Sequence, residues 1–189
     1  MEETFFYKSN FNLFHSRFQI PAPANWQDFE DLCTALWREI WEDPNTQKNG
    51  RQGQVQYGVD IIGQPGRGEK WAGVQCKLKD NSTGKSLTEE EVKIEIESAK
   101  HFSPKLSEFI IATTAVKDAK IESFARKVTI EHQNQGLFSV HIFGWEDIVS
   151  RLDILKKHEQ EEELFTYGYL LKTIVANYYL NYYYKYNRS

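Results

Sequence analysis

The order of apolar and polar residues predicts a chain in which helices and strands alternate. Between Asn25 and Trp41, apolar side chains recur at the i, i+3, i+4, i+7 spacing of a single helix face. Asn25 stands where its side chain can cap the first turn. We therefore expect an amphipathic helix that buries one face. The apolar positions of that face are Phe29, Leu32, Cys33, Leu36, Trp37, Ile40 and Trp41.

A β-hairpin is predicted downstream of this helix. A polar, glycine-rich segment leads into two apolar runs, VDII at residues 59–62 and VQCK at residues 74–77. The sequence QPGRGE between them supplies the glycine and proline that turns favour. We expect the two runs to pair antiparallel.

A second helix and a buried strand are expected next. Thr88, with Glu91 three residues later, is a capping-box pattern for a helix that runs to about His101. The segment VKIEIE inside it also alternates with strand periodicity, so a strand stays an alternative there. The run FIIATTAV, residues 109–116, is continuously apolar and β-branched, which predicts a buried strand.

The last part of the pattern completes the fold class. We predict a helix from Asp118 to Gln133 that Gly136 stops, a strand at SVHIFGW (139–145) and a helix at EDIVSRLDILKKH (146–158). Strands that alternate with helices favour parallel neighbours, whereas the hairpin is antiparallel. The expected class is α/β, with a mixed β-sheet flanked by helices on both faces.

Length and composition place this pattern in one domain. The chain has 189 residues, of which 40% are hydrophobic and 14% aromatic, enough for one ordinary core. We assign residues 1–160 to this domain. The aromatic tail, residues 161–189, is predicted to be a helix that closes the domain or leads to a missing domain. Lys172, Asn177 and Asn181 interrupt it too often for a membrane span.

The N-terminal sequence and the two cysteines indicate the cellular location and limit the kind of metal site. The start MEETFFYKSN is too polar for a secretion signal, which indicates a cytoplasmic protein with no membrane partner. Cys33 and Cys76 lie in apolar contexts without C-x-x-C spacing, so neither a disulfide framework nor a zinc site is indicated. A metal site would have to use oxygen ligands.

The distribution of charge singles out one segment. The formal net charge of −4 gives no general reason to expect nucleic acid as a partner. Residues 48–85, however, contain seven Lys and Arg against three acids. This basic segment predicts local contacts with phosphate, although solvated surface charge explains such a run equally well. The candidates for DNA contact are Lys48, Arg51, Gln54, Lys79 and Lys85.

Three polar residues interrupt the predicted hairpin. Asp60 lies inside VDII, and Gln75 and Lys77 interrupt VQCK. Burying an unpaired carboxylate is costly, so Asp60 needs a partner or a metal ion. Strand alternation puts Gln75 and Lys77 on one face, and pairing of the strands brings Asp60 beside them. Oxygens of Asp60 and Gln75, with the Cys76 backbone carbonyl, suit Mg²⁺, while Lys77 can orient a water and offset phosphate charge.

The spacing D-x(14)-Q-x-K resembles the PD-(D/E)xK nuclease superfamily, in the variant where glutamine replaces the second acid. DFEDLC resembles the F-E-x-L helix of Mrr-type restriction-endonuclease-like domains, and GRQGQVQYGVDI and VQCK resemble their two catalytic segments. This resemblance covers about residues 25–145. It implies a restriction-endonuclease-like fold with Glu30, Asp60, Gln75 and Lys77 as the active site. The chain lacks the proline before Asp60 and the glutamate at position 75, which weakens the charge balance at the metal.

Helix geometry supports Glu30 separately. At about 100° per residue, Glu30 lies about 80° from the centre of the apolar stripe, whereas Asp31 points nearly opposite to it. Glu30 is therefore the acid at the edge of the core, able to assist a metal or its water. A plain surface acid stays the alternative for this residue.

The implied function is a Mg²⁺-dependent endonuclease that hydrolyses phosphodiester bonds of double-stranded DNA, with Mn²⁺ able to substitute. Such domains resemble the nuclease effector heads of bacterial anti-phage and restriction systems, which implies a homodimer or a sensor or NTPase domain or partner. Two alternatives stay open. One is a nuclease fold that binds nucleic acid or protein without cutting, and the other is a nuclease for RNA or branched junctions.

Overall fold

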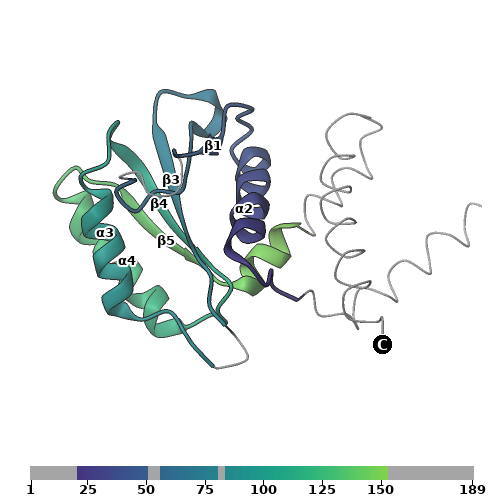
Figure 1. The fold of residues 1–189 in the computed structure, drawn as a ribbon. Helices are drawn as coiled ribbons and strands as arrows, with labels where there is room; N and C mark the ends of the chain where they lie inside the picture. Colours follow the sequence, from purple (N-terminus) through teal and green to yellow (C-terminus); the bar gives the residue numbers. More distant parts are fainter. Residues whose placement is uncertain (1–20, 51–55, 81–83, 153–189) are drawn as a thin grey trace, which may run out of the picture.

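The structure, a computed structural model, describes residues 21–50, 56–80 and 84–152, which form an α/β fold (Figure 1). None of the described helices is long and apolar enough to cross a bilayer. The predicted tail at residues 161–189, and the domain boundary at residue 160, lie outside the described residues. The helices are α2 (Trp26–Ile40), α3 (Glu89–Ala99) and α4 (Ala119–Gln133), with further helical turns at residues 145–152.

The described residues build one five-stranded mixed sheet in the order β1-β2-β3-β4-β5. The first three strands pair antiparallel, and the last three pair parallel. This confirms the predicted combination of an antiparallel hairpin with parallel neighbours. The strands are β1 (Gln47–Lys48), β2 (Ile61–Gly63), β3 (Trp71–Lys77), β4 (Leu106–Thr113) and β5 (Ser139–Phe143).

Helices cover both faces of the sheet, so its strands separate two hydrophobic clusters. One cluster packs α2 and residues 145–152 against the sheet and includes the buried Phe29 and Trp37. The other packs α3 and α4 against the opposite face and includes Val92 and Phe109. Figure 1 shows α2 on one side of the strands and α3 and α4 on the other. The ends of β2 and β3 therefore lie between two helical layers.

Side-chain caps fix the starts of the helices. The Asn25 side chain accepts a hydrogen bond from the Asp28 backbone N–H at 2.9 Å, which confirms the predicted cap of α2. Thr88 and Glu91 form the predicted capping box of α3. The alternative strand for VKIEIE is therefore wrong, because the capped helix buries one face against the sheet. That face is formed by Val92, Ile96 and Ala99.

The strands differ from the predictions in several bounds and in one additional strand; β2 begins at Ile61 rather than residue 59, and β3 at Trp71 rather than residue 74. Strand β4 begins at Leu106 rather than residue 109, because backbone pairing with Trp71 extends it into a less apolar segment. Strand β1 was not predicted, since its two polar residues have no apolar periodicity and pair with β2 through the backbone. Strand β5 ends at Phe143, and Trp145 belongs to the helical turns that follow.

Candidate active site

Asp60 and Gln75 lie side by side across the β2–β3 pair, as the strand pattern predicts. The Asp60 N–H donates to the Val74 carbonyl at 2.8 Å, and β2 continues in register with Ile61 opposite Val74. The amide nitrogen of Gln75, a residue only 8% exposed, donates to Asp60 Oδ2 at 2.6 Å. The Cys76 backbone N–H donates to the same oxygen at 2.7 Å. Within residues 21–50, 56–80 and 84–152, both hydrogen bonds to the Asp60 carboxylate fall on Oδ2, and Oδ1 is the oxygen available to a ligand.

The environment of Asp60 disfavours its charged form. Burial raises the pKa of Asp60 from 3.8 to about 6, and the charges of Glu30 and Glu95 push it in the same direction. The hydrogen bond from Cys76 and the charge of Lys77 oppose this rise without cancelling it. A carboxylate destabilised in this way gains from a nearby cation, so strongly shifted acids of this kind mark candidate functional sites.

Glu30 reaches the same place from helix α2. Its side chain is only 14% exposed, whereas that of Asp31 is 65% exposed, which confirms the predicted edge position of Glu30. Lys48 of β1, predicted as a DNA contact, lies 3.3 Å from Glu30 Oε1 and 2.8 Å from Asp31 Oδ1. Burial lowers the pKa of Lys48, but bonds to both acids raise it overall, so this lysine stays charged.

Lys77 is bound to an acid that the sequence did not single out. Its Nζ forms a hydrogen-bonded ion pair with Glu95 Oε1 of α3. Glu95 lies in the run EEEVKIEIE, where nothing in the sequence separates it from its acidic neighbours. Helix α3 packs beside β3, however, and a register drawn through Val92 and Ile96 would have placed Glu95 at the edge of its buried face. Lys77 therefore lies within the electrostatic range of Asp60 while Glu95 holds its ammonium group.

Three of the seven basic residues in the segment 48–85, Lys48, Lys77 and Lys79, form ion pairs with acids of α2 and α3. Lys79 pairs with Glu91 of α3, one turn before Glu95, and this hydrogen bond lowers the pKa of Glu91. Lys85 is exposed, as a DNA contact would require. Arg51 and Gln54 lie outside the described residues. The local excess of positive charge seen in the sequence is therefore smaller in the folded protein.

Cys76 contributes its backbone rather than its thiol. Its carbonyl accepts a hydrogen bond from the Gln75 amide at 3.3 Å, next to Asp60. Hydrogen bonding to Cys33, with burial, raises the pKa of the Cys76 thiol well above its usual value, which disfavours the nucleophilic thiolate form. Both cysteines are free.

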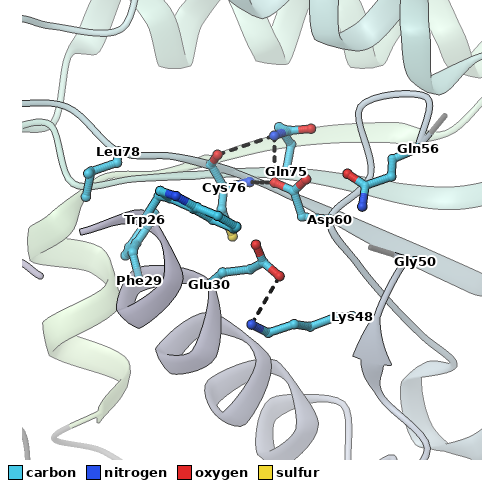
Figure 2. A pocket seen from close by; sticks show the side chains of 10 residues that line it. All are labelled: Trp26, Phe29, Glu30, Lys48, Gly50, Gln56, Asp60, Gln75, Cys76 and Leu78. Carbon is cyan, nitrogen blue, oxygen red and sulfur yellow. Dashed lines mark hydrogen bonds and ion pairs between the residues drawn. The ribbon is translucent and has the colours of Figure 1, made fainter. Parts of the chain in front are cut away.

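Asp60, Gln75, Cys76, Glu30 and Lys48 line one open cavity of about 480 Å³, whereas Lys77 is not among the described residues that line it (Figure 2). Asp60, Gln75, Glu30, Lys48 and Gln56 form its polar part, and Figure 2 shows Glu30 directed between Asp60 and Lys48. The volume lies in the range of about 300–1,000 Å³ that is typical of ligand sites. The complete lining is Trp26, Phe29, Glu30, Lys48, Gly50, Gln56, Asp60, Gln75, Cys76 and Leu78.

The donor set fits a hard cation. Two carboxylates, an amide and a backbone carbonyl offer the oxygen ligands that Mg²⁺ prefers, and Asp60, Gln75 and Cys76 are already joined by hydrogen bonds. The Gln75 amide turns its nitrogen toward Asp60, so a half-turn of the amide would bring its oxygen to an ion. No cluster of three or more His, Cys, Asp and Glu side chains suited to a metal occurs among residues 21–50, 56–80 and 84–152. The predicted set falls outside that class because half of its ligands are neutral.

No protein-family model, no curated protein and no solved structure matches this chain.

Proposed function

We propose that this protein is a Mg²⁺-dependent endonuclease with a restriction-endonuclease-like fold that hydrolyses phosphodiester bonds in DNA. The observation that carries the proposal is Asp60. It is a half-buried carboxylate whose pKa is raised to about 6, it accepts a hydrogen bond from Gln75, and it lines an open cavity together with Glu30.

Four groups would hold the metal: the carboxylates of Asp60 and Glu30, the Gln75 amide and the Cys76 carbonyl. When bound, Mg²⁺ supplies a Lewis acid for the phosphoryl oxygen and a more acidic bound water. Mn²⁺ should substitute, because it accepts the same oxygen ligands.

The protein's own contribution is to place charge around the phosphate. Lys77 projects from the strand that carries Gln75, so its ammonium can orient a water and offset charge that develops on the phosphate. Glu95 restrains that ammonium through the ion pair from α3. Because Lys77 is fixed before substrate arrives, little reorganisation is needed during reaction.

The direct test is a cleavage assay on supercoiled and linear DNA with Mg²⁺, Mn²⁺ or EDTA. We expect nicking or cutting by the wild type with either metal and none in EDTA. Lys77→Ala should abolish cleavage, while Lys105→Ala, a change on an exposed residue, should leave it intact. Cleavage that survives EDTA, or equal cleavage by Lys77→Ala, would refute the proposed site.

The ion pairs of Lys48 and Lys77 also fit a second candidate function, binding without cleavage. Lys48 and Lys77 are both engaged by acids, an arrangement that also suits a module that binds nucleic acid or protein without cutting it. Binding without cleavage under every metal condition would select that alternative. Cleavage rates on RNA, branched junctions and duplex DNA, measured side by side, would identify the preferred substrate.

The position of the metal can be tested by crystallography. Crystals soaked in Mn²⁺ should show an ion within about 2.0–2.4 Å of oxygens from Asp60, Gln75 and Cys76. An ion elsewhere, with these groups turned apart, would contradict the ligand set.

We further propose that the protein is a cytoplasmic effector of an anti-phage or restriction system and that it acts as a homodimer or with a sensor or NTPase partner.

A further inference from the structure

The candidate active site has an aromatic wall that the proposed chemistry does not use. Trp26, Phe29 and Leu78 line the cavity on the side away from Gln56 and Lys48 (Figure 2). Phe29 is completely buried, but Trp26 is 43% exposed. Of the five tryptophans, all of which the structure describes, Trp26 alone is exposed. A large indole left open to solvent inside a polar cavity offers a surface for a planar ligand.

The backbone that carries the Trp26 indole is fixed by a capped helix start. Trp26 is the first residue of α2, and Asn25 and Asp28 fix that turn with two hydrogen bonds of 2.6 and 2.9 Å. Phe29, one turn further, is packed edge-on against Trp145 at 6.5 Å between ring centroids. An aromatic side chain has only two χ angles to order, so on this rigid backbone it loses little conformational entropy when a ligand stacks on it.

Trp26 and Glu30 are separated by one helical turn on the same face of α2. Side chains at i and i+4 lie about 5–6 Å apart at their Cβ atoms. This separation is comparable to that between a phosphate and the base of the same nucleotide. A phosphate beside Glu30 and Asp60 would therefore bring its own base to the Trp26 ring. In a continuous duplex that base is paired and stacked, so it reaches the ring only when it is unpaired.

We infer that Trp26 is the stacking platform for one unpaired nucleobase next to the phosphate that is cut. The nature of the ligand rests on the proposed function, and the inference specifies the substrate class: DNA with a gap, a flap or another single-stranded stretch. Stacking on an aromatic ring accepts any base, so this subsite selects unpaired structure rather than sequence. Gln56 and Lys48 on the facing wall supply hydrogen-bonding groups for the edge of the base.

The test compares three variants on two substrates. Trp26→Ala removes the ring, Trp26→Phe keeps a smaller one, and Ile130→Ala is a control at a 61% exposed position on α4. Each protein is assayed for cleavage and, in EDTA, for binding to an uninterrupted duplex and to the same duplex with a short gap. Tryptophan fluorescence reports stacking directly, and thermal unfolding verifies that each variant is folded.

The expected result is a preference of the wild type for the gapped DNA, with quenching of its fluorescence. Trp26→Ala should bind and cut gapped DNA about 5- to 150-fold less well, Trp26→Phe should retain most of both, and Ile130→Ala should equal the wild type. If Trp26→Ala fails to fold, the fluorescence measurement tests the inference instead, because quenching by gapped DNA must disappear in Trp26→Phe. Wild-type behaviour of a folded Trp26→Ala, or a preference for uninterrupted duplex, would overturn the inference.

The two proposals can fail separately. Quenching by gapped DNA that depends on Trp26, without cleavage under Mg²⁺ or Mn²⁺, would overturn the nuclease and leave the stacking site. Cleavage of continuous duplex at the same rate with and without the Trp26 ring would overturn the stacking site and leave the nuclease. A wild type that binds neither DNA would overturn the stacking site and point to a protein partner for the exposed indole.

Discussion

Replacement of Asp60 by asparagine should make the protein more stable at neutral pH and inactive. Asparagine keeps the shape of the side chain, and its carbonyl can still accept the hydrogen bonds that Gln75 and Cys76 donate to Asp60. What the substitution removes is a charge that burial disfavours. Stability and cleavage should therefore change in opposite directions.

The magnitude follows from the pKa of Asp60. A rise from 3.8 to about 6 corresponds to about 3 kcal/mol at about 1.36 kcal/mol for each pKa unit. Because the folded-state pKa lies above the unfolded value, the folded protein holds the proton more tightly. The penalty for the charge is absent below about pH 3.8, grows as pH rises to about 6 and is complete above it.

The assay is denaturant unfolding of wild type and Asp60→Asn at several pH values. Asp60→Asn should be more stable by up to about 3 kcal/mol at pH 7.5, or about 6–12 °C in Tm for a chain of this size, and should approach the wild type near pH 4. Exposed Glu69, changed to Gln, is the control and should show little dependence on pH. A difference that is constant across pH, or a destabilised Asp60→Asn at pH 7.5, would refute the reasoning.

Three further outcomes are expected. Glu95→Gln should lower kcat with little change in KM or DNA affinity, since it loosens Lys77 without removing it, and an unchanged kcat would show that the ion pair is only structural. Metal affinity, measured by calorimetry, should fall as pH drops through about 6, because Asp60 becomes protonated there, and a flat profile would remove Asp60 from the ligand set. Gly63→Ala should destabilise the fold by about 1–3 kcal/mol in urea unfolding. An added Cβ would lie 2.6 Å from the ring of the buried Trp41. An unchanged free energy of unfolding would show that the structure relaxes around this contact without cost.

The sequence predicted those parts of the fold that depend on local rules. The apolar stripe and cap of α2 and the capping box of α3 depend on neighbours three or four residues away, and both are confirmed. Strand alternation was enough to bring Asp60 beside Gln75. Strand β1 has no such signal, because its pairing uses only backbone groups.

The partners of the site's lysines could not be predicted. The contacts of Lys48 with Glu30 and of Lys77 with Glu95 depend on how α2 and α3 pack on the sheet. Seven basic residues in one segment suggested an open positive surface, but acids from helices outside that segment pair with three of them, Lys48, Lys77 and Lys79. Exposure of Trp26 was equally hidden, since helical periodicity alone places it close to the buried stripe.

Because β1 is a short edge strand, the cavity wall that it forms should open more easily than the wall formed by β3. Lys48 is held by a two-residue pairing at the rim of the sheet, whereas Gln75 lies in β3, which is paired on both sides. Local opening of an edge requires far less free energy than opening of a central strand. In native-state hydrogen exchange, the amide of Lys48 should therefore exchange through local fluctuations and that of Gln75 only through global unfolding. We therefore expect the wall formed by β1 to open more readily than the wall formed by β3, which carries the proposed metal ligand Gln75.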